Sequence, residues 1–215
     1  MRINRLLLSV LFMQLSVGAM ADLPTPTTED GWISLFDGKT LNGWKVNENP
    51  ETFSVDDGAI VVNGDRSHLF YAGDVNGHDF KNFELKLEVM TFQGSNSGIY
   101  FHTQFQEKGF PGIGHEVQVN ISHTDWRRSG SIYGVVHVDT VPVVDKQWYT
   151  QHIIVNGNQV RILIDGKLIL EYNEPKTKTA PHTGRAISSG TFALQGHDPG
   201  SKVLFRNIRV KILPD

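Results

Sequence analysis

The sequence predicts an all-β protein built as a two-sheet antiparallel β-sandwich of the jelly-roll type. Asn-Gly or Asp-Gly, the dipeptides typical of tight hairpin turns, occurs eight times along the chain. Between these turns lie short runs rich in β-branched and aromatic residues, which favour strands. Beyond the first 21 residues, no stretch keeps the apolar period of about 3.6 residues that is typical of an amphipathic helix.

The first 21 residues have the three parts of a secretory signal peptide. Residues 1–5 form a short segment with a basic character, residues 6–17 form an apolar segment, and Ala-Met-Ala at 19–21 offers a cleavage site. A membrane anchor is the alternative, but the apolar run is shorter than the roughly 20 residues that a spanning helix needs. No cysteine follows the cleavage site to carry a lipid. We therefore expect a periplasmic or secreted protein with no membrane attachment after signal cleavage.

Residues 22–30 are predicted to be a short linker, and residues 31–215 a single domain. One β-sandwich of this length can have a sizeable core. The net charge of -3 gives no electrostatic reason to bind nucleic acid or anionic membranes. The absence of cysteine excludes disulfides, thiolate nucleophiles and Cys-ligated zinc. Any catalysis must therefore use oxygen and imidazole groups.

Alternation of apolar and polar residues, together with the turns, predicts the strands. Apolar residues at 83–89 alternate with Glu and Lys, as in a strand with one face toward a core and one toward water. The hairpin at 160–172 turns on Asp165-Gly166 and has apolar groups on both faces, which favours a place deeper in the sandwich. The predicted strands are 59–62, 83–91, 97–103, 115–120, 149–155, 159–164, 167–172, 191–195 and 203–212.

A row of polar side chains on the strand 115–120 is the first candidate site. Because side chains alternate along a strand, Glu116, Gln118 and Asn120 share one face while Val117 and Val119 face the core. On a curved sheet this row would line a groove suited to hydrogen-bonding several hydroxyl groups. The alternative is an ordinary solvated outer face.

The strand 97–103 offers a second row of polar side chains. The same alternation places Tyr100, His102 and Gln104 on one face. If this strand neighbours 115–120, a carboxylate, an imidazole and an aromatic ring come together. A lone histidine in a strand is more often structural, which is the alternative for His102.

Two further segments place polar groups at strand ends. Gln195 and His197 leave the strand 191–195 on the same side, and Asp198 follows in an Asp-Pro-Gly turn, which it could simply cap. The loop after Asn120 carries Trp126 and Arg127, residue types that suit recognition of sugars and anionic groups. A solvated loop with a half-buried tryptophan is the alternative there.

Several familiar catalytic motifs are absent from the sequence. Nine histidines suggest a metal, but His115-Glu116 is followed by Val119 where the zincin helix motif needs histidine. No Gly-x-Ser-x-Gly elbow, phosphate-binding loop or dinucleotide-binding fingerprint occurs in a suitable context. Serine hydrolases and nucleotide enzymes are therefore disfavoured.

Five stretches of the sequence, in order along the chain, carry a resemblance to a known family. They are GWISLFDGKTLNGW at 31–44, NSGIYF at 96–101, HEVQV at 115–119, GSIYG at 130–134, and the stretch 190–209 with LQGH and FRNIR. Together they resemble the 3-keto-disaccharide hydrolase domain family, a concanavalin A-like sandwich. The resemblance covers the mature chain from end to end.

The resemblance implies an enzyme that cleaves glycosides whose sugar has been oxidised at C3. The ketone acidifies the C2 proton, so one base can remove it, an enolate forms and the aglycone leaves from C1; water can then complete net hydrolysis. We expect Glu116 as the base, with His197 or His102 as the acid or enolate donor. The candidates for binding the substrate are Tyr100, Gln118, Asn120, Trp126, Arg127, Tyr133 and Gln195.

The same resemblance implies a carbohydrate substrate supplied by a separate sugar 3-oxidoreductase. The reaction requires no cofactor, although a divalent cation, with ligands that the sequence does not identify, could polarise the ketone. Two other functions stay open. One is a non-catalytic lectin-like module. The other is an ordinary glycoside hydrolase, which would need a second carboxylate where the row after Glu116 has amides.

Overall fold

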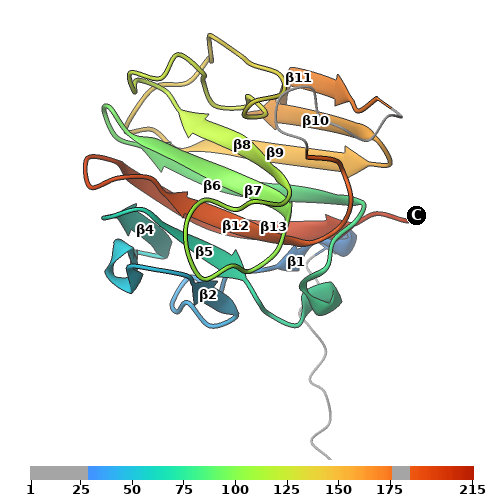
Figure 1. Ribbon diagram of the computed structural model, residues 1–215, viewed down its shortest axis with the longest axis horizontal. Helices are drawn as coiled ribbons and strands as arrows, with labels where there is room; N and C mark the ends of the chain where they lie inside the picture. Colours follow the sequence, from blue (N-terminus) through green and yellow to red (C-terminus); the bar gives the residue numbers. More distant parts are fainter. Residues whose placement is uncertain (1–28, 176–184) are drawn as a thin grey trace, which may run out of the picture.

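The computed structural model describes residues 29–175 and 185–215 as two antiparallel β-sheets packed face to face (Figure 1). The predicted all-β sandwich is therefore confirmed. The signal peptide predicted at 1–21 and most of the linker predicted at 22–30 lie outside the described residues, and both stay predictions. Within the described ranges, no helix is long and apolar enough to cross a membrane.

The larger sheet has eight strands in the described part of the chain, in the order β11-β10-β9-β6-β13-β4-β3, with β1 paired to β13. All of these pairs are antiparallel. The strands are β1 (Ile33–Ser34), β3 (Phe53–Asp56), β4 (Ala59–Asn63), β6 (Phe83–Thr91), β9 (Tyr149–Asn156), β10 (Gln159–Ile164), β11 (Lys167–Asn173) and β13 (Lys202–Ile212).

The smaller sheet has five strands among the described residues, in the order β2-β5-β12-β7-β8. Its strands are β2 (Trp44–Val46), β5 (Ser67–Tyr71), β7 (Asn96–Thr103), β8 (His115–Asn120) and β12 (Thr191–Gly196). The short helical turns are η1 (Glu29–Gly31), η2 (Pro50–Thr52) and η3 (Val75–His78). Because β12 lies between β5 and β7, segments that are distant in the sequence share one sheet face.

The hydrophobic core lies between the sheets and follows the alternation of the strands. On β6, the apolar side chains predicted to face inward are all buried, and the polar ones between them are partly exposed. Phe83 of β6 contacts Phe101 of β7 and Phe192 of β12, with ring centroids 6.0 and 4.9 Å apart. These contacts join the two sheets and fix which face of the smaller sheet points outward.

The hairpin of β10 and β11 is confirmed, but its predicted deep position is wrong. Asp165 and Gly166 both have positive φ (48° and 77°), as an Asp-Gly hairpin turn requires. However, β11 is the edge strand of the larger sheet, and Leu168 is half exposed. The second apolar face lies beside the loop at Val138, where Leu168 lines a surface groove.

A bulge at His102 interrupts β7. His102 has a φ of 53°, and the register of β7 against β12 shifts at the same place. Gly114 and Gly190 make room for the bulge, because a Cβ at either position would lie 2.7 Å from the His102 carbonyl carbon. The backbone here can turn because both neighbours lack side chains.

Three buried histidines should make the fold sensitive to acid. Burial lowers the pKa of His68 to about 3 and the pKa values of His102 and His115 to about 4, from an ordinary value of 6.5. Below pH 6.5 the unfolded chain takes up protons that the folded chain does not. The free energy of unfolding should therefore fall as the pH drops toward 4, by about 1.4 kcal/mol per pH unit for each histidine.

We expect His68→Leu to flatten this slope by roughly one third, measured by urea unfolding between neutral pH and about pH 4.5. Neither ring nitrogen of His68 has a partner among the described residues, so leucine loses no hydrogen bond there. His78→Leu, at an exposed position, is the matched control for the change from histidine to leucine. An unchanged slope in His68→Leu would contradict a neutral, buried His68.

Candidate functional site

A cluster of polar side chains lies on the outer face of the smaller sheet, with Glu116 of β8 at its centre. Tyr100 Oη donates a hydrogen bond to Glu116 Oε2 (2.7 Å), and Gln195 Nε2 donates to Glu116 Oε1 (3.1 Å). The same Gln195 amide also donates to Tyr100 Oη (3.1 Å). Strand register explains the meeting, because Tyr100 pairs with Glu116 on one side and with Ala193 on the other. The strands β7 and β8 are neighbours, which is the condition under which the sequence brought Tyr100 and Glu116 together.

Gly98 provides the space that the Glu116 carboxylate occupies. Gly98 lies on β7 opposite Gln118 of β8. A Cβ at Gly98 would lie 2.5 Å from Glu116 Oε1 and 2.8 Å from Glu116 Cγ. The missing side chain lets Glu116 lean across β7 and reach Gln195 on β12.

Burial makes Glu116 a stronger base than an exposed carboxylate. Burial raises the pKa of Glu116 above its ordinary 4.5, and it outweighs the hydrogen bonds from Tyr100 and Gln195 and the charges of Arg185 and His197, which lower the pKa. Burial and the neighbouring carboxylate also raise the pKa of Tyr100 well above 10.0, so its hydroxyl remains a donor. A raised carboxylate pKa favours proton abstraction.

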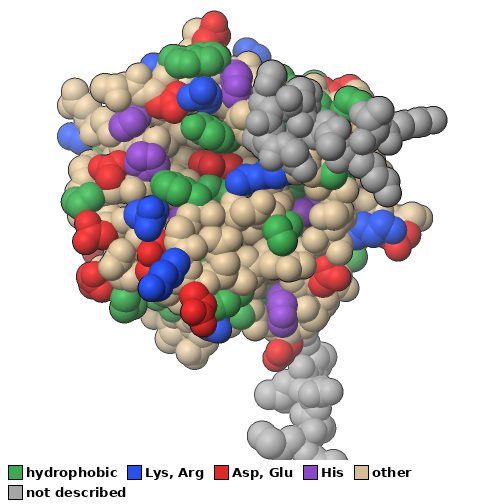
Figure 2. All heavy atoms as spheres, in the orientation of Figure 1, with side chains coloured by type: hydrophobic (Ala, Val, Ile, Leu, Met, Phe, Trp, Pro, Cys, Tyr) green, Lys and Arg blue, Asp and Glu red, His purple; other side chains and the backbone are tan. Residues whose placement is uncertain are grey.

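A cavity of about 320 Å³ opens over this cluster. Acidic, basic and histidine side chains gather beside hydrophobic ones on this face of the molecule (Figure 2). The smaller sheet forms the floor, and the segments that connect its strands form the walls. The lining residues are Asn96, Tyr100, Phe110, Glu116, Gln118, Asp125, Tyr133, Arg185, Gln195 and His197.

His197 lies just beyond β12 and is oriented by Asp198. His197 Nδ1 donates to Asp198 Oδ2 (2.6 Å), and the same carboxylate accepts from Ser201 Oγ (2.9 Å) and from the Gly200 N–H (2.8 Å). Asp198 therefore caps its turn, as one interpretation of the sequence held, and also fixes the imidazole. With Nδ1 bonded, proton exchange with a ligand falls to Nε2.

Two amide oxygens in the floor of the cavity have no hydrogen-bond partner in the described part of the chain. They belong to Gln118 and Gln195, which are each 1% exposed. Gln118 is held through its Nε2, which donates to Asn96 Oδ1 (2.7 Å). A buried acceptor without a partner costs free energy. Neither oxygen is exposed to the cavity in this structure, so among the described residues both are unsatisfied acceptors buried in its floor.

The structure does not bring His102 to this cavity, and the alternation predicted for it is wrong. The bulge in β7 turns its ring into the core, against Phe83 and Phe101 (ring centroids 5.7 and 5.1 Å away). Both ring nitrogens contact the backbone. Nε2 lies 3.0 Å from the Lys81 carbonyl oxygen, and Nδ1 accepts the N–H of Ser188 (3.2 Å).

Asn120 shares the predicted face but holds a loop. Its Nδ2 donates to the carbonyls of Asp125 (2.9 Å) and Arg127 (2.8 Å). Its Oδ1 accepts the N–H of His123 (2.9 Å) and a hydrogen bond from Arg128 (3.3 Å). Asn120 therefore shapes the wall of the cavity without lining it.

Trp126, Arg127 and Tyr133 form an aromatic and cationic rim, and the structure brings these three predicted residues together. The Arg127 guanidinium lies 5.2 Å from the Trp126 ring centroid and 4.8 Å from the Tyr133 ring centroid. It also forms an ion pair with Asp125 (3.0 Å). Trp126 and Tyr133 are 52% and 40% exposed. Because Asp125 and Tyr133 line the cavity, the rim borders it directly.

Phe110 and Arg185 reach the cavity from loops and are not among the site residues predicted from the sequence. The Phe110 ring lies 5.5 Å from the His68 ring and 6.2 Å from the His197 ring. Arg185 precedes β12, and its Nη2 donates to the Pro111 carbonyl (2.6 Å). Loop residues follow no alternation, so the sequence carries no comparable signal for either.

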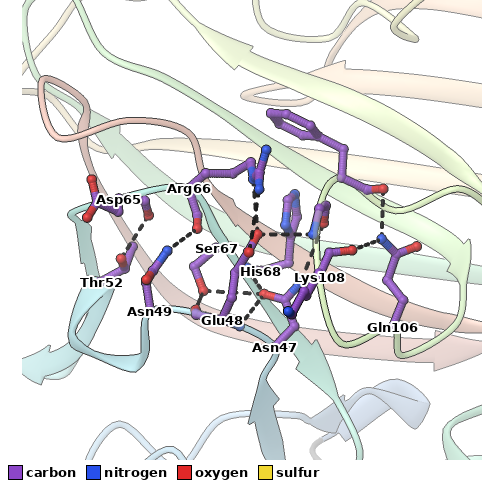
Figure 3. A network of polar contacts seen from close by, with 12 residues as sticks. Asn47, Glu48, Asn49, Thr52, Asp65, Arg66, Ser67, His68, Gln106 and Lys108 are labelled. Carbon is purple, nitrogen blue, oxygen red and sulfur yellow. Dashed lines mark hydrogen bonds and ion pairs between the residues drawn. The ribbon is translucent and has the colours of Figure 1, made fainter.

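A polar network holds the loop of Phe110 in place (Figure 3). Glu48 Oε1 accepts a hydrogen bond from Arg66 Nε (3.0 Å) and another from the Gly109 N–H (3.0 Å). Gln106 Nε2 braces the loop internally by donating to the Phe110 carbonyl (2.9 Å). One wall of the cavity is thus tied to the segment that leads into β5.

No group of three or more histidine, cysteine or acidic side chains that could hold a metal occurs among the described residues. In the cavity, Glu116 already accepts hydrogen bonds from Tyr100 and Gln195, and Asp125 pairs with Arg127. A divalent cation, for which the sequence identified no ligands, stays a prediction.

Known proteins share this fold. The chain is 29% identical over 251 residues to a 3-keto-disaccharide hydrolase of Bacteroides thetaiotaomicron, across 93% of this chain and 84% of that protein. A solved structure from Parabacteroides distasonis, provisionally named a glycosyl hydrolase, has a TM-score of 0.71 at 24% identity, covering 88% and 99% of the two chains. The carbohydrate binding module CBM66 from Bacillus subtilis has a TM-score of 0.57 at 14% identity, covering 79% and 95%.

A family match covers the whole site. The sequence pattern of the 3-keto-alpha-glucoside-1,2-lyase-like domain matches residues 31–211, a range that includes every residue lining the cavity. It contains the five stretches that carried the resemblance. The chain therefore belongs to the 3-keto-alpha-glucoside-1,2-lyase-like domain family.

Proposed function

We propose that this protein cleaves the glycosidic bond of glycosides whose sugar carries a ketone at C3. The observation that carries the proposal is a buried carboxylate, Glu116, with a pKa raised by burial, in a cavity whose floor has two unpartnered amide oxygens. Membership of the 3-keto-alpha-glucoside-1,2-lyase-like family and the similarity to a 3-keto-disaccharide hydrolase support it.

The ketone makes the C2 proton acidic enough for a carboxylate to remove. The electron pair of the C2–H bond then enters the C2–C3 bond, which leaves an enolate oxygen at C3. Collapse of the enolate forms a C1–C2 double bond and breaks the C1–O bond, and the aglycone oxygen takes a proton from an acid. The products are an unsaturated 3-keto sugar and the free aglycone. Addition of water across the double bond gives net hydrolysis.

Glu116 acts as the base and His197 as the acid in this proposal. The raised pKa of Glu116 increases its basicity toward a C–H proton. Asp198 fixes the imidazole of His197 through Nδ1. Gln118 and Gln195, which line the cavity beside Glu116, position the sugar. His102, packed in the core, takes no part in proton transfer.

The rim of Trp126, Arg127 and Tyr133 would bind the aglycone, because aromatic rings pack well against sugar rings and planar groups. The substrate must come from a separate sugar 3-oxidoreductase, since ordinary glycosides have no ketone at C3. We place the reaction in the periplasm or the medium, on the basis of the predicted signal peptide.

A non-catalytic carbohydrate-binding module is the second candidate function. The aromatic rim favours it, and the fold shared with CBM66 is compatible with it. An ordinary glycoside hydrolase has less support because it needs two carboxylates that flank the scissile bond. The other carboxylate that lines the cavity, Asp125, is paired with Arg127 at 3.0 Å.

Glu116→Gln should lower kcat for a 3-keto-glucoside by about 100-fold or more, because the base is lost while size and hydrogen bonding are kept. Release of the aglycone measures the effect, and thermal melting checks the fold. Glu171→Gln, at an exposed position on β11, is the matched control. Unchanged turnover in Glu116→Gln would move the base to another residue, and unchanged binding without any wild-type turnover would favour the binding module.

Gly98→Ala should lower kcat by about 10-fold or more, because its Cβ would displace the Glu116 carboxylate from Gln195. Gly112→Ala is the control, since its Cβ would meet Gln106 at an ordinary 3.8 Å. Steady-state kinetics on the same 3-keto-glucoside measure both variants. Full activity in Gly98→Ala would show that the observed carboxylate position is not needed.

Reaction in heavy water should place deuterium at C2 of any hydrated product, or yield an unsaturated sugar, because the enolate route breaks the C2–H bond. The unoxidised parent glucoside should not react, since its C2 proton is too weakly acidic. Mass spectrometry and proton NMR of the products measure this. Clean cleavage of the parent glucoside with C2 hydrogen retained would instead support an ordinary glycoside hydrolase.

A further inference from the structure

Arg185 reaches the cavity from the segment that precedes β12. It lines the cavity together with Glu116, and its charge opposes the rise that burial causes in the pKa of Glu116. Its Nη2 donates to the Pro111 carbonyl (2.6 Å) in the loop of Phe110. A guanidinium is thus held between two loops, directly over the sheet that carries the proposed base.

Glu174, just after β11, anchors the segment of Arg185. Both of its carboxylate oxygens accept the N–H of Ile187, at 2.9 and 2.8 Å. Glu174 is 6% exposed, and burial raises its pKa. A buried acidic group is costly unless it is hydrogen-bonded. Here its bonds go to a backbone amide two residues from Arg185.

His102 anchors the next residue of the same segment. The Lys81 carbonyl can only accept, so the Nε2 of His102 carries the hydrogen of that 3.0 Å bond, and Nδ1 is free to accept the N–H of Ser188 (3.2 Å). Burial lowers the pKa of His102 to about 4, which keeps the ring neutral and able to accept. Two buried side chains therefore hold two consecutive amides beside Arg185.

We propose that Arg185 is a catalytic residue, the cation that stabilises the enolate oxygen at C3, and that Glu174 and His102 are the positioning residues that hold it over the sugar. This inference rests on the proposed function. His102, which the sequence suggested as a catalytic residue, would then act from the core as a positioning residue.

The movement of charge in the reaction explains why a guanidinium belongs there. When Glu116 takes the C2 proton, its negative charge disappears, and an equal charge develops on the C3 oxygen. Tyr100 and Gln195 are already bonded to the carboxylate, so the new oxyanion needs a different donor. A fixed cation at a developing oxyanion typically contributes about 100-fold or more to the rate.

Arg185→Gln should lower kcat for a 3-keto-glucoside by about 100-fold, with a smaller change in KM, because the interaction forms as charge develops. Arg185→Lys keeps the positive charge but not the paired N–H donors of the guanidinium. It should lower kcat by about 10-fold. Exchange of the C2 hydrogen in heavy water should slow by the same factors, since it reports enolate formation directly.

Glu174→Met keeps the size of the side chain but removes the carboxylate, and it should lower kcat by about 10-fold with unchanged KM. Glu174→Gln keeps one accepting oxygen and should restore activity close to wild type. Glu171→Met, at an exposed position on β11, the strand that precedes Glu174, is the matched control. In an Arg185→Gln background, Glu174→Met should cause no further loss, because both changes remove the same contribution.

The pH profile separates positioning from general damage. Because the charge of Arg185 lowers the pKa of Glu116, the acid limb of kcat/KM should move to higher pH in Arg185→Gln and in Glu174→Met. A loss of packing would instead lower the rate equally at every pH. The other charged group that lowers the Glu116 pKa, His197, is unchanged in these variants.

Wild-type kcat in Arg185→Gln would overturn the catalytic role, and additive losses in the double variant would overturn the positioning role. If Glu174→Met does not fold, Ile187→Pro can replace it, because proline has no N–H to donate to Glu174. This variant is then combined with Arg185→Gln in the same test for additive losses. Activity lost in Glu116→Gln but kept in Arg185→Gln rejects this inference alone. Activity kept in both variants would move both the base and the cation to other residues, whereas no turnover of any 3-keto-glycoside by the wild-type protein rejects the proposed function.

Discussion

The site depends on the burial of one carboxylate, Glu116, on the surface of a β-sheet. A buried charge is tolerated only with good hydrogen bonds, and here Tyr100 and Gln195 supply them from two other strands. The strands β8, β7 and β12 must therefore pair in one register, with Gly98 leaving the gap between them. The core on the opposite face drives that pairing, so the packing that folds the protein also assembles the partners of the carboxylate.

The walls of the cavity are held in one recurring way, in which a buried or partly buried polar side chain accepts or donates hydrogen bonds at the backbone of a loop. Asn120 holds the loop after β8, Glu48 holds the loop of Phe110, and Glu174 holds the segment of Arg185. Loops lack the regular hydrogen bonds of strands, so such fixed partners give them a defined path. The bonds of Glu48 and Glu174 join residues 61 and 13 positions apart in the sequence, which is why Phe110 and Arg185 could not be predicted.

Alternation along regular strands suffices to predict the floor of the cavity. Glu116 and Gln118 share the outer face because β8 runs without interruption. Alternation breaks at His102, because a bulge turns the His102 side chain into the core. The bulge requires Gly114 and Gly190, which come from two other segments, and no local pattern around His102 records it. The face to which a side chain points can therefore be predicted from alternation only where the pairing of its strand is regular.

The electrostatics of the cavity support the proposed removal of the C2 proton better than direct displacement at C1. Displacement needs two carboxylates with different environments on either side of the bond. Glu116 is buried with a raised pKa, whereas Asp125 lies at the rim and is paired with Arg127. A ketone at C3 removes the need for a second carboxylate, because the acidity of the C2 proton replaces a nucleophile. In the proposed reaction, one buried base, Glu116, and one fixed cation, Arg185, which line the same cavity, are then sufficient on a sandwich that is also found in a carbohydrate binding module.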